Sequence, residues 1–219
     1  MTGLFPKFLL PFRHRRPGLQ LVLGGIVAVF ILCLTLGNDI LVTGDPLAGD
    51  IVIRFKPMWS DGHWLGTDQL GRDLWTRVLA GFPWSLGIAL TATLIAMTVG
   101  TTAGLIAAWR PGKVRTVVNR SVDMIIAFPG LVIAICVIAV LERGFWPLAL
   151  TLGMLTWPYY ARVIYAEALG LLQRNYVLAA KLFGVSGGWI LLRHILPGVR
   201  PTLMVMLAFH FADMLIAES

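Results

Sequence analysis

The chain has 219 residues, of which 58% are hydrophobic and only 13% are charged, and its mean hydropathy is +0.81. Soluble domains average about 45–50% apolar and about 25% charged residues, so a core of this size cannot bury so much apolar surface, and a lipid bilayer is the expected solvent. The net charge of +7 would suit nucleic-acid binding, but the basic residues form short clusters between apolar runs, which the positive-inside rule of membrane proteins explains better.

Five apolar runs are long enough to cross a bilayer as helices, which takes about 20 residues each. They cover residues 19–42, 85–109, 122–141, 148–165 and 199–217. We therefore expect an all-α, polytopic transmembrane helical bundle, with an N-terminal segment of residues 1–18 and one transmembrane domain of residues 19–219. A cleaved signal peptide is the alternative interpretation of the first run, but that run is too long and no small-residue cleavage site follows it promptly.

The distribution of basic residues predicts how this bundle is oriented. If five spans alternate, the N-terminus, the loop 110–120 and the insert 167–197 share one side, and the segment 44–83 lies on the other. The first side carries Lys7, Arg13, Arg15, Arg16, Arg110, Lys113, Arg115, Arg120, Arg174, Lys181 and Arg193, and the second carries Arg54, Lys56, Arg72, Arg77 and Arg143. Because cytoplasmic loops are enriched in Lys and Arg, we expect a cytoplasmic N-terminus (1–18) and an outer segment (44–83).

The motifs of catalytic proteins are missing from the sequence. Gly112-Lys113 lacks the preceding glycine and the following hydroxyl of a phosphate-binding loop. The histidines are scattered, with no pair at the spacing of a metal site, and no Ser/His/Asp set can be assembled. We interpret Cys33 and Cys136, which lie in separate apolar runs, as small core hydrophobes rather than a disulfide or redox pair. The chain is therefore expected not to be an enzyme and to hold no metal or cofactor of its own.

Proline interrupts two of the predicted spans, at Phe128-Pro129-Gly130 and at Trp157-Pro158. Proline removes a backbone donor and clashes with the preceding turn, so each should kink its helix. Lipid cannot satisfy the carbonyl that a kink frees, so we expect both kinks to face the interior of the bundle. A packing role and a place on a translocation path are equally compatible with the pattern.

Ionisable residues fall inside the predicted spans, among them Asp123, His210 and Asp213. Asp123 lies near the cytoplasmic start of the third, and His210 and Asp213 lie three residues apart, on one face of the fifth. Intramembrane charges are costly and usually face a bundle interior or a wet cavity. For His210 and Asp213 we favour a hydrogen-bonded pair that ties helices together, with a role in substrate or ion passage as the alternative.

The outer segment contains a polar motif that precedes an amphipathic pattern. Thr67 or Asp68 can cap a helix start. Apolar residues then recur on one face, while Asp68/Arg72 and Asp73/Arg77 are spaced as ion pairs on the other. We expect a helix that lies flat at the outer membrane interface before the chain enters the bilayer at Ser85.

The insert 167–197 contains two short predicted helices joined at a glycine. The first is amphipathic, lies in the segment that begins at Asn175 and ends at Gly184, a residue suited to a left-handed helix terminus. The second begins near Ser186, continues through Trp189 to Ile195 and breaks at Pro197. Two short helices joined in this way make a protruding knob that fits a partner's groove.

These two segments resemble the inner-membrane permeases of ABC importers, specifically the second permease subunit of the dipeptide/oligopeptide/nickel group. The outer signature is similar at Leu65-Gly66-Thr67-Asp68-x-Leu70-Gly71-Arg72-Asp73, and the coupling motif at Ala179-Ala180-x-x-x-Gly184 followed by Arg193-His194-Ile195-Leu196-Pro197. The resemblance implies an ATPase-coupling segment that comprises Tyr176, Ala179, Ala180, Lys181, Gly184, Val185, Ser186, Leu196 and Pro197. It also implies an outer interfacial motif of Gly66, Thr67, Asp68, Gly71, Arg72 and Asp73. The proline breaks and the charges within the predicted spans, in turn, give a candidate translocation path with Phe128, Pro129, Trp157, Pro158, His210 and Asp213.

Two features depart from the family pattern. The coupling motif's usual leading glutamate is Leu178 here, so that polar contact to an ATPase is either absent or supplied by another residue. The family also continues past the fifth span into an outer loop and a sixth helix, which this sequence lacks. The expected fold is therefore that of a type I ABC importer permease with five spans and the sixth missing, from a truncated product or from part of a longer subunit.

The resemblance implies one permease subunit of an ATP-driven importer in a bacterial inner membrane. Its implied partners are a homologous permease that completes a heterodimer, two cytoplasmic ATPase subunits that bind ATP and Mg²⁺, an extracytoplasmic substrate-binding protein, and membrane lipid, but no nucleic acid. Short peptides are the favoured cargo, with nickel or a metal chelate as the second choice. A stand-alone secondary transporter or channel is the main alternative, and a membrane scaffold that transports nothing is another.

Overall fold

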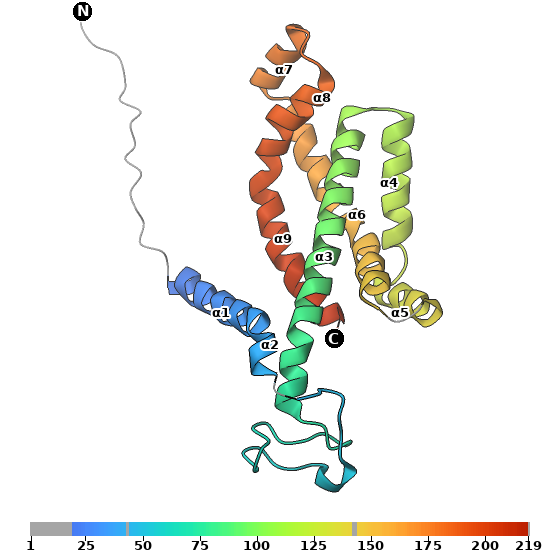
Figure 1. Cartoon of the computed structure of the whole chain (residues 1–219). Coiled ribbons are helices and arrows are strands. Elements are labelled where there is room, and N and C mark those ends of the chain that lie inside the picture. The colour runs from blue at the N-terminus through green and yellow to red at the C-terminus, as the bar shows by residue number, and fades with distance from the viewer. Residues whose placement is uncertain (1–18, 43, 142–143, 219) are drawn as a thin grey trace, which may run out of the picture. The chain divides into compact units, whose positions relative to one another are not determined.

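A computed structural model describes residues 19–42, 44–141 and 144–218 (Figure 1). Over these ranges the regular elements are helices, and extended backbone pairs only at two isolated bridges, Ser60–His63 and Thr67–Asp73. The predicted all-α class is confirmed. The chain divides into two compact units, Met1–Phe82 and Pro83–Ser219, and each is described by itself. The basic residues of the predicted segment 1–18, and Arg143, lie outside the described residues.

The first unit contains two N-terminal helices and an irregular polar segment. Helices α1 (Leu19–Leu36) and α2 (Asn38–Leu41) share the first predicted span. They are separated at Gly37, whose N–H donates to the Cys33 carbonyl. Beyond them lie a 3-10 turn, Ile51–Ile53, and the start of α3 (Leu74–Trp109), which continues into the second unit.

The second unit is a helical bundle. Its elements after α3 are α4 (Lys113–Ile126), α5 (Gly130–Val140), α6 (Phe145–Leu172), α7 (Asn175–Leu182), α8 (Gly187–Ile190), a π-helical segment (Leu191–Ile195) and α9 (Leu196–Glu218). In the part of the chain that the structure describes, two continuous helices are long and apolar enough to cross a membrane, Leu74–Trp109 and Gly187–Glu218, and Val22–Leu36 is a shorter apolar helix. As membrane spans, the five predicted ranges stay predictions.

Helices α3 and α6 run parallel and pack closely because small residues line their contact. A Cβ at Gly100 would collide with the Trp157 carbonyl, and one at Gly104 would lie 2.7 Å from the carbonyl oxygen of Ala161. The α6 residue Gly153 would likewise come within 2.9 Å of the Ala92 carbonyl oxygen. Such close backbone approach maximises dispersion contacts, which drive helix association where the hydrophobic effect cannot.

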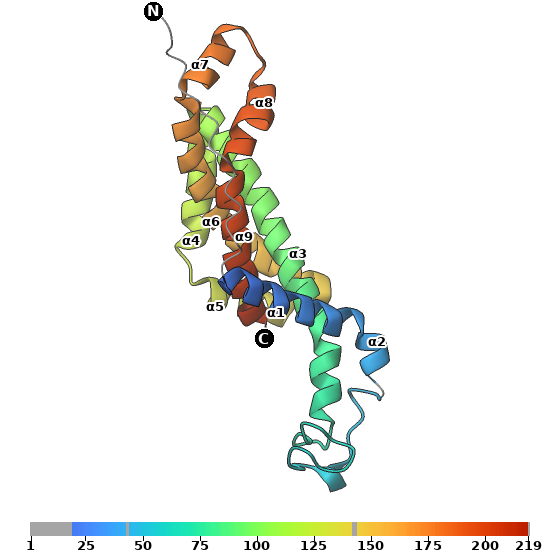
Figure 2. The same cartoon turned by 90° about the vertical axis from the view of Figure 1, so that its left-hand side faces the viewer.

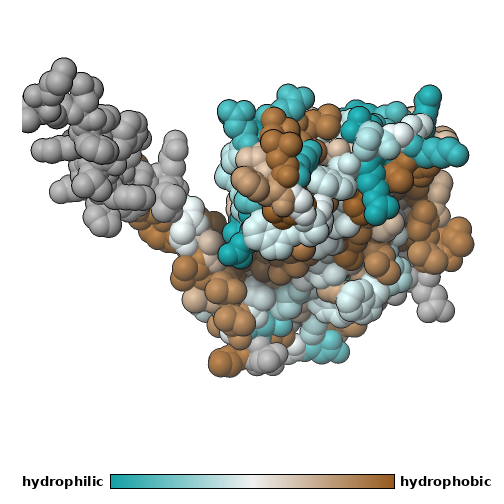
Figure 3. All heavy atoms as spheres, turned by 90° about the horizontal axis from the view of Figure 1, so that it is seen from above, coloured by the Kyte–Doolittle hydropathy of each residue, from teal (hydrophilic) through white to brown (hydrophobic). Residues whose placement is uncertain are grey.

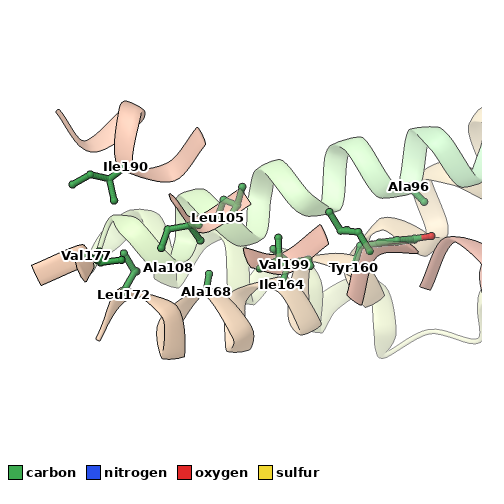
Figure 4. Packing of buried hydrophobic residues seen from close by; sticks show 12 residues of the cluster. Ala96, Leu105, Ala108, Tyr160, Ile164, Ala168, Leu172, Val177, Ile190 and Val199 are labelled. Carbon is green, nitrogen blue, oxygen red and sulfur yellow. The ribbon is translucent and has the colours of Figure 1, made fainter. Parts of the chain in front are cut away.

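The largest buried cluster joins this helix pair to the chain's C-terminal elements. Figure 4 shows Ala96, Leu105 and Ala108 of α3 together with Tyr160, Ile164 and Ala168 of α6. The same cluster includes Val177 of α7, Ile190 of α8 and Val199 of α9. The short helices α7 and α8 are therefore fixed to the bundle through apolar side chains.

The third predicted span is two helices rather than one. α4 ends at Ile126, Pro129 precedes the first residue of α5, and the intervening backbone is not helical. Proline restricts the residue before it to extended conformations, so the sequence Phe128-Pro129 ends the helix instead of kinking it. Pro158, in contrast, lies within the continuous helix α6.

The predicted loop 110–120 is also shorter than expected. Gly112 has a left-handed backbone, φ +88°, and α4 begins at Lys113, so the basic residues that follow lie on a helix. Arg115 folds back and donates to the carbonyls of Ala107 and Ala108 at the end of α3.

The prediction that the two cysteines are core residues is wrong. Both Cys33 and Cys136 are free thiols on exposed faces of their helices. A helix face that meets lipid is as apolar as one that meets the core, so hydrophobicity alone does not place a residue inside the bundle.

Candidate functional site

Helices α7 and α8 form a protruding knob, residues 175–190, at one end of the second unit. Figures 1 and 2 both place them at the end where α3 finishes and α4 begins. Seen from that end, apolar groups lie among polar ones on the surface (Figure 3). The most exposed apolar side chains of the knob are Leu182 and Phe183, at 88% and 87%. Two such side chains at a protruding tip suit insertion into a partner's groove.

The turn between the two helices has the hydrogen bonds of a Schellman motif. Gly184 is left-handed at φ +72°, as the sequence predicts. Its N–H donates to the Lys181 carbonyl, and the Val185 N–H donates to the Ala180 carbonyl. These bonds satisfy carbonyls that the end of α7 would otherwise leave free. Ala180 and Val185 both pack against the large cluster, so the turn is anchored to the bundle.

Trp109, at the end of α3, is a second point of contact between the knob and the bundle. The Lys181 ammonium lies 5.0 Å from the centre of the Trp109 ring, a cation–π distance. Gly187, the first residue of α8, faces the same ring so closely that a Cβ there would collide with it. The knob therefore contacts α3 through one aromatic side chain as well as being continuous with α9.

The remaining coupling residues lie at the base of the knob. The His194 ring lies 5.9 Å from that of Tyr176 and 5.1 Å from that of Trp189, which joins α7 to the π-helical segment. Leu196 packs on the cluster, and Pro197 lies in the first turn of α9. Ser186 precedes α8 and accepts the Ile190 N–H through its carbonyl. Ala179 is exposed, whereas Ala180 is half-buried against the bundle.

The outer motif folds as a tight loop around one carboxylate. Asp68 accepts hydrogen bonds from the backbone N–H groups of Leu70 and Arg72 at 2.8 and 2.9 Å. It also pairs with the guanidinium groups of Arg72 and Arg77 at 2.8 and 2.6 Å. Burial alone would raise the pKa of Asp68, but the hydrogen bonds from the Arg72 and Leu70 N–H groups and the Arg72 guanidinium favour the charged form more strongly and lower the pKa to about 2.

Two glycines and the Thr67 side chain complete the loop. Gly66 and Gly71 are left-handed, at φ +78° and +71°, and a Cβ on either would collide with a carbonyl of the facing strand of chain. The Thr67 hydroxyl accepts from the Lys56 N–H at 2.9 Å and donates to the Ile53 carbonyl. These contacts join the motif to residues more than ten positions earlier in the chain.

The helix after this motif begins later than predicted. Asp73, rather than Thr67 or Asp68, caps it by accepting the Thr76 N–H and hydroxyl at 2.8 and 2.7 Å. Burial would raise the Asp73 pKa, but these bonds and the His63 ring at 3.0 Å lower it. From Leu74 the helix runs unbroken into the second unit, so the expected separate helix at the membrane interface is not formed. The predicted Asp68–Arg72 pair is present, and Arg77 pairs with Asp68 instead of Asp73.

The six predicted path residues are not gathered into one site. Trp157 and Pro158 are buried in α6, while Phe128 and Pro129 are exposed at the break before α5. The His210 ring lies 4.9 Å from that of Tyr160, and Asp213 is exposed. Among the described residues, no hydrogen bond or ion pair joins His210 to Asp213, so the predicted tie between helices is replaced by a ring contact.

One ion pair was missed by the sequence analysis. Arg162 of α6 contacts Asp123 of α4 at 2.7 Å. Arg162 falls inside the predicted span 148–165, and a lone arginine in an apolar run is itself a signal of function. Over the described ranges, no group of three or more His, Cys, Asp or Glu residues could hold a metal ion.

The comparisons with known proteins agree with this architecture. Residues 100–219 match the family described as binding-protein-dependent transport system inner membrane component. A putative peptide transport system permease protein of Brucella abortus is 38% identical over 207 residues, 94% of this chain and 68% of the relative. A probable D,D-dipeptide transport system permease protein of Escherichia coli K12 is 33% identical over 184 residues, 84% of this chain and 61% of the relative. A glutathione transport system permease protein of Pectobacterium atrosepticum is 34% identical over 160 residues, 73% of this chain and 53% of the relative.

The chain thus spans between about half and about two thirds of the length of these relatives. The family match includes the knob and most of the bundle that supports it, and the alignment with the Brucella protein covers 94% of the chain. On this evidence the chain belongs to the family of inner membrane components of binding-protein-dependent transport systems.

Proposed function

We propose that the chain is a transmembrane permease subunit of an ATP-driven importer of short peptides. The observation that carries the proposal is the anchored knob with Leu182 and Phe183 exposed at its tip, in a chain of this transport family. The relatives named above are described as permeases for peptides, a D,D-dipeptide and glutathione, itself a peptide. These names support peptides as cargo over nickel or a metal chelate.

The proposed transporter contains four kinds of subunit. A homologous permease completes the membrane pore, two cytoplasmic ATPase subunits bind ATP and Mg²⁺, and an extracytoplasmic binding protein delivers the peptide. Hydrolysis of ATP takes place in the ATPase subunits. The family is defined by transport that depends on a binding protein, which supports the last of these partners.

In this proposal the knob transmits the motion of the ATPases to the helices of the bundle. The exposed tip would sit in a groove of an ATPase subunit, and ATP binding would shift the knob's position. The shift would reach α9 through α8 and the π-helical segment, and α3 through Trp109. For the coupling to work, the contacts of the knob with the ATPase must differ between the two nucleotide states.

The topology is proposed on the basic-residue bias. The N-terminus and the knob would lie in the cytoplasm, and the outer segment would face the other side. Labelling of Ser60→Cys from outside intact cells, with Thr116→Cys protected, is the expected result. If only Thr116→Cys were labelled from outside, the chain would have the opposite orientation to the one proposed.

The test of the function uses the tip of the knob. Phe183→Asp puts a charge where an apolar side chain would enter a dry groove, and such burial is strongly unfavourable. We expect complexes with this substitution to lose their ATPase subunits on a sizing column and to lose ATP-driven uptake of a labelled dipeptide. Because Phe183 is almost fully exposed, the fold of the permease should survive.

The control is Val52→Asp, a charge placed on an equally exposed apolar residue of the outer segment. It should leave ATPase association unchanged. If Phe183→Asp complexes keep their ATPase subunits and transport normally, the knob is not the coupling element. If uptake instead follows a proton gradient without ATP, the chain is a secondary transporter.

A further inference from the structure

The ion pair between Arg162 and Asp123 lies at an unusual place in the second unit. Arg162 Nη2 and Asp123 Oδ1 are 2.7 Å apart, yet the two side chains remain 58% and 55% exposed. Surface ion pairs of soluble proteins look similar and contribute little. In a chain that crosses a membrane, an exposed ion pair near the membrane surface can be hydrated, whereas an exposed pair within the membrane needs water or protein beside it.

Arg162 lies inside α6, and Asp123 lies in the last turn of α4, far from the end where that helix begins. At 1.5 Å per residue, Asp123 is about 15 Å from the start of α4 at Lys113, and Arg162 is about 15 Å from the end of α6 at Leu172. Apolar residues of α6 flank Arg162 on both sides. A half-exposed arginine and aspartate at this depth would be costly against lipid. The α4–α6 face that carries them therefore borders water or protein.

Another surface of the second unit has a different character. A cavity of about 420 Å³ lies between α3 and the start of α9 and is lined by residues such as Leu105, Ile106, Leu191 and Leu203. A Cβ at Gly104 of α3 would meet Ala161 and Tyr165 of α6, so Ile106 and Arg162 lie within about one helical turn of each other along the parallel helices. The two faces thus offer apolar and charged surfaces at one level of the membrane.

The chemistry of the pair leaves room for a ligand. Over the residues that the structure describes, Arg162 Nη2 to Asp123 Oδ1 is the single contact that either group makes. The other guanidinium donors of Arg162 and the second oxygen of Asp123 therefore stay open. A cavity of about 190 Å³ adjoins them, lined also by Asn119 and Tyr165. A carboxylate fits the free edge of a guanidinium, and an ammonium fits a free carboxylate oxygen.

We propose that Asp123 and Arg162 form a substrate-contacting site on the wall of the translocation passage, where they bind the charged ends of a peptide. Arg162 binds the C-terminal carboxylate and Asp123 the N-terminal ammonium. This inference rests on the proposed function and adds the residues that recognise the cargo inside the membrane. It predicts that the passage distinguishes a free peptide from the same peptide with either end blocked.

The test begins with water access to the site in the assembled transporter, held in nanodiscs with its partner subunits. Cys33→Ser and Cys136→Ser remove the natural thiols. Met124→Cys then places one thiol on an exposed position next to Asp123, and Ile106→Cys places one on the apolar face. A charged, membrane-impermeant thiol reagent should modify Met124→Cys and leave Ile106→Cys unmodified.

The second step measures protection by a defined peptide. Alanyl-alanine should slow the modification of Met124→Cys, and its C-terminal amide or N-acetyl form should need about tenfold higher concentration for the same protection, the effect of losing one charge-assisted hydrogen bond. Arg162→Gln should abolish the discrimination against the amide, and Asp123→Asn the discrimination against the acetyl form. Arg120→Gln, an exposed arginine one turn earlier on α4, is the matched control and should change neither.

The outcomes separate the site from the function. A transporter that takes up dipeptide with ATP but shows no modification of Met124→Cys, or equal protection by free and blocked peptides, overturns the site and leaves the function standing. A transporter with no ATP-driven dipeptide uptake overturns both. If Arg162→Gln does not assemble, Arg162→Lys keeps the charge and should show weakened discrimination. Full discrimination in Arg162→Lys together with full discrimination in Asp123→Asn contradicts the proposal.

Discussion

The outer motif and the knob are both short, turn-rich segments, yet different forces hold them. The outer motif is organised around the Asp68 carboxylate and two guanidinium groups, with glycines where backbone segments touch. The knob is held by apolar contacts with the bundle, by one cation–π contact and by a Schellman turn. The first should therefore respond strongly to pH and to backbone crowding. The second should respond mainly to changes in packing.

The largest effect is expected at Gly71 of the outer motif. Gly71→Ala would place a Cβ against the backbone of Asp50 and would also strain a left-handed residue. We expect a loss of more than about 2 kcal/mol in the stability of this segment. Gly62→Ala is the matched control, because Gly62 is equally left-handed at φ +79° but has open space around it. The rate of proteolysis of this segment in the purified protein compares the two variants. Equal rates would show that the neighbouring backbone shifts and relieves the collision at residue 71.

The next effect concerns the charge of Asp68. Its pKa is lowered to about 2, from an unfolded value of about 3.9. A lowered folded pKa stabilises the segment above the unfolded value, and that stabilisation is lost as pH falls from about 4 to about 2. The fluorescence of Trp59 and Trp64, which lie 5.6 Å apart in this segment, should report the transition. Asp68→Asn should lower the melting temperature at pH 7 and flatten the dependence of stability on pH. Some pH dependence should remain, because the pKa of Asp73 is also lowered.

A smaller effect is expected at the turn of the knob. Gly184→Val keeps open space around the new side chain but forces a β-branched residue to φ +72°, at a cost of about 1–2 kcal/mol. Transport should fall while insertion into the membrane is unaffected. Gly170→Ala in α6, which also meets no neighbouring atom, should be neutral or slightly stabilising. Undiminished transport by Gly184→Val would show that the turn tolerates strain without loss of coupling.

The smallest effect is expected from the contact between Lys181 and Trp109. Lys181→Met keeps the aliphatic part of the side chain and removes the charge above the ring, a loss of about 0.5–1 kcal/mol at an exposed site. The coupling between ATPase activity and uptake should weaken slightly. Trp109→Leu in the same background tests the origin of the change, since the two effects should not add if one contact is responsible.

Several features of the fold follow from local sequence. The helical class, the left-handed Gly184 and the two short helices around it were predicted because propensity and glycine chemistry act over a few residues. In the outer motif, local sequence did not predict the structure. The pair Asp68–Arg72 was predicted as a helical i,i+4 pair, but it forms in a loop. Asp73 could be recognised as the cap only once its bonds to Thr76 were known.

The sequence by itself determined the apolar runs, the helix-ending residues and the charge bias of the loops, because these depend on composition and on neighbours along the chain. Only the tertiary structure decided which face of each helix is buried, because lipid and a protein core both favour apolar side chains. Hydropathy therefore could not show that Cys136 lies on an exposed helix face. The tertiary structure also decided the partners of the charges. Arg162 and Asp123 are separated by 39 positions, and only the packing of α4 against α6 brings them together, because a contact between distant residues depends on the geometry of the whole bundle.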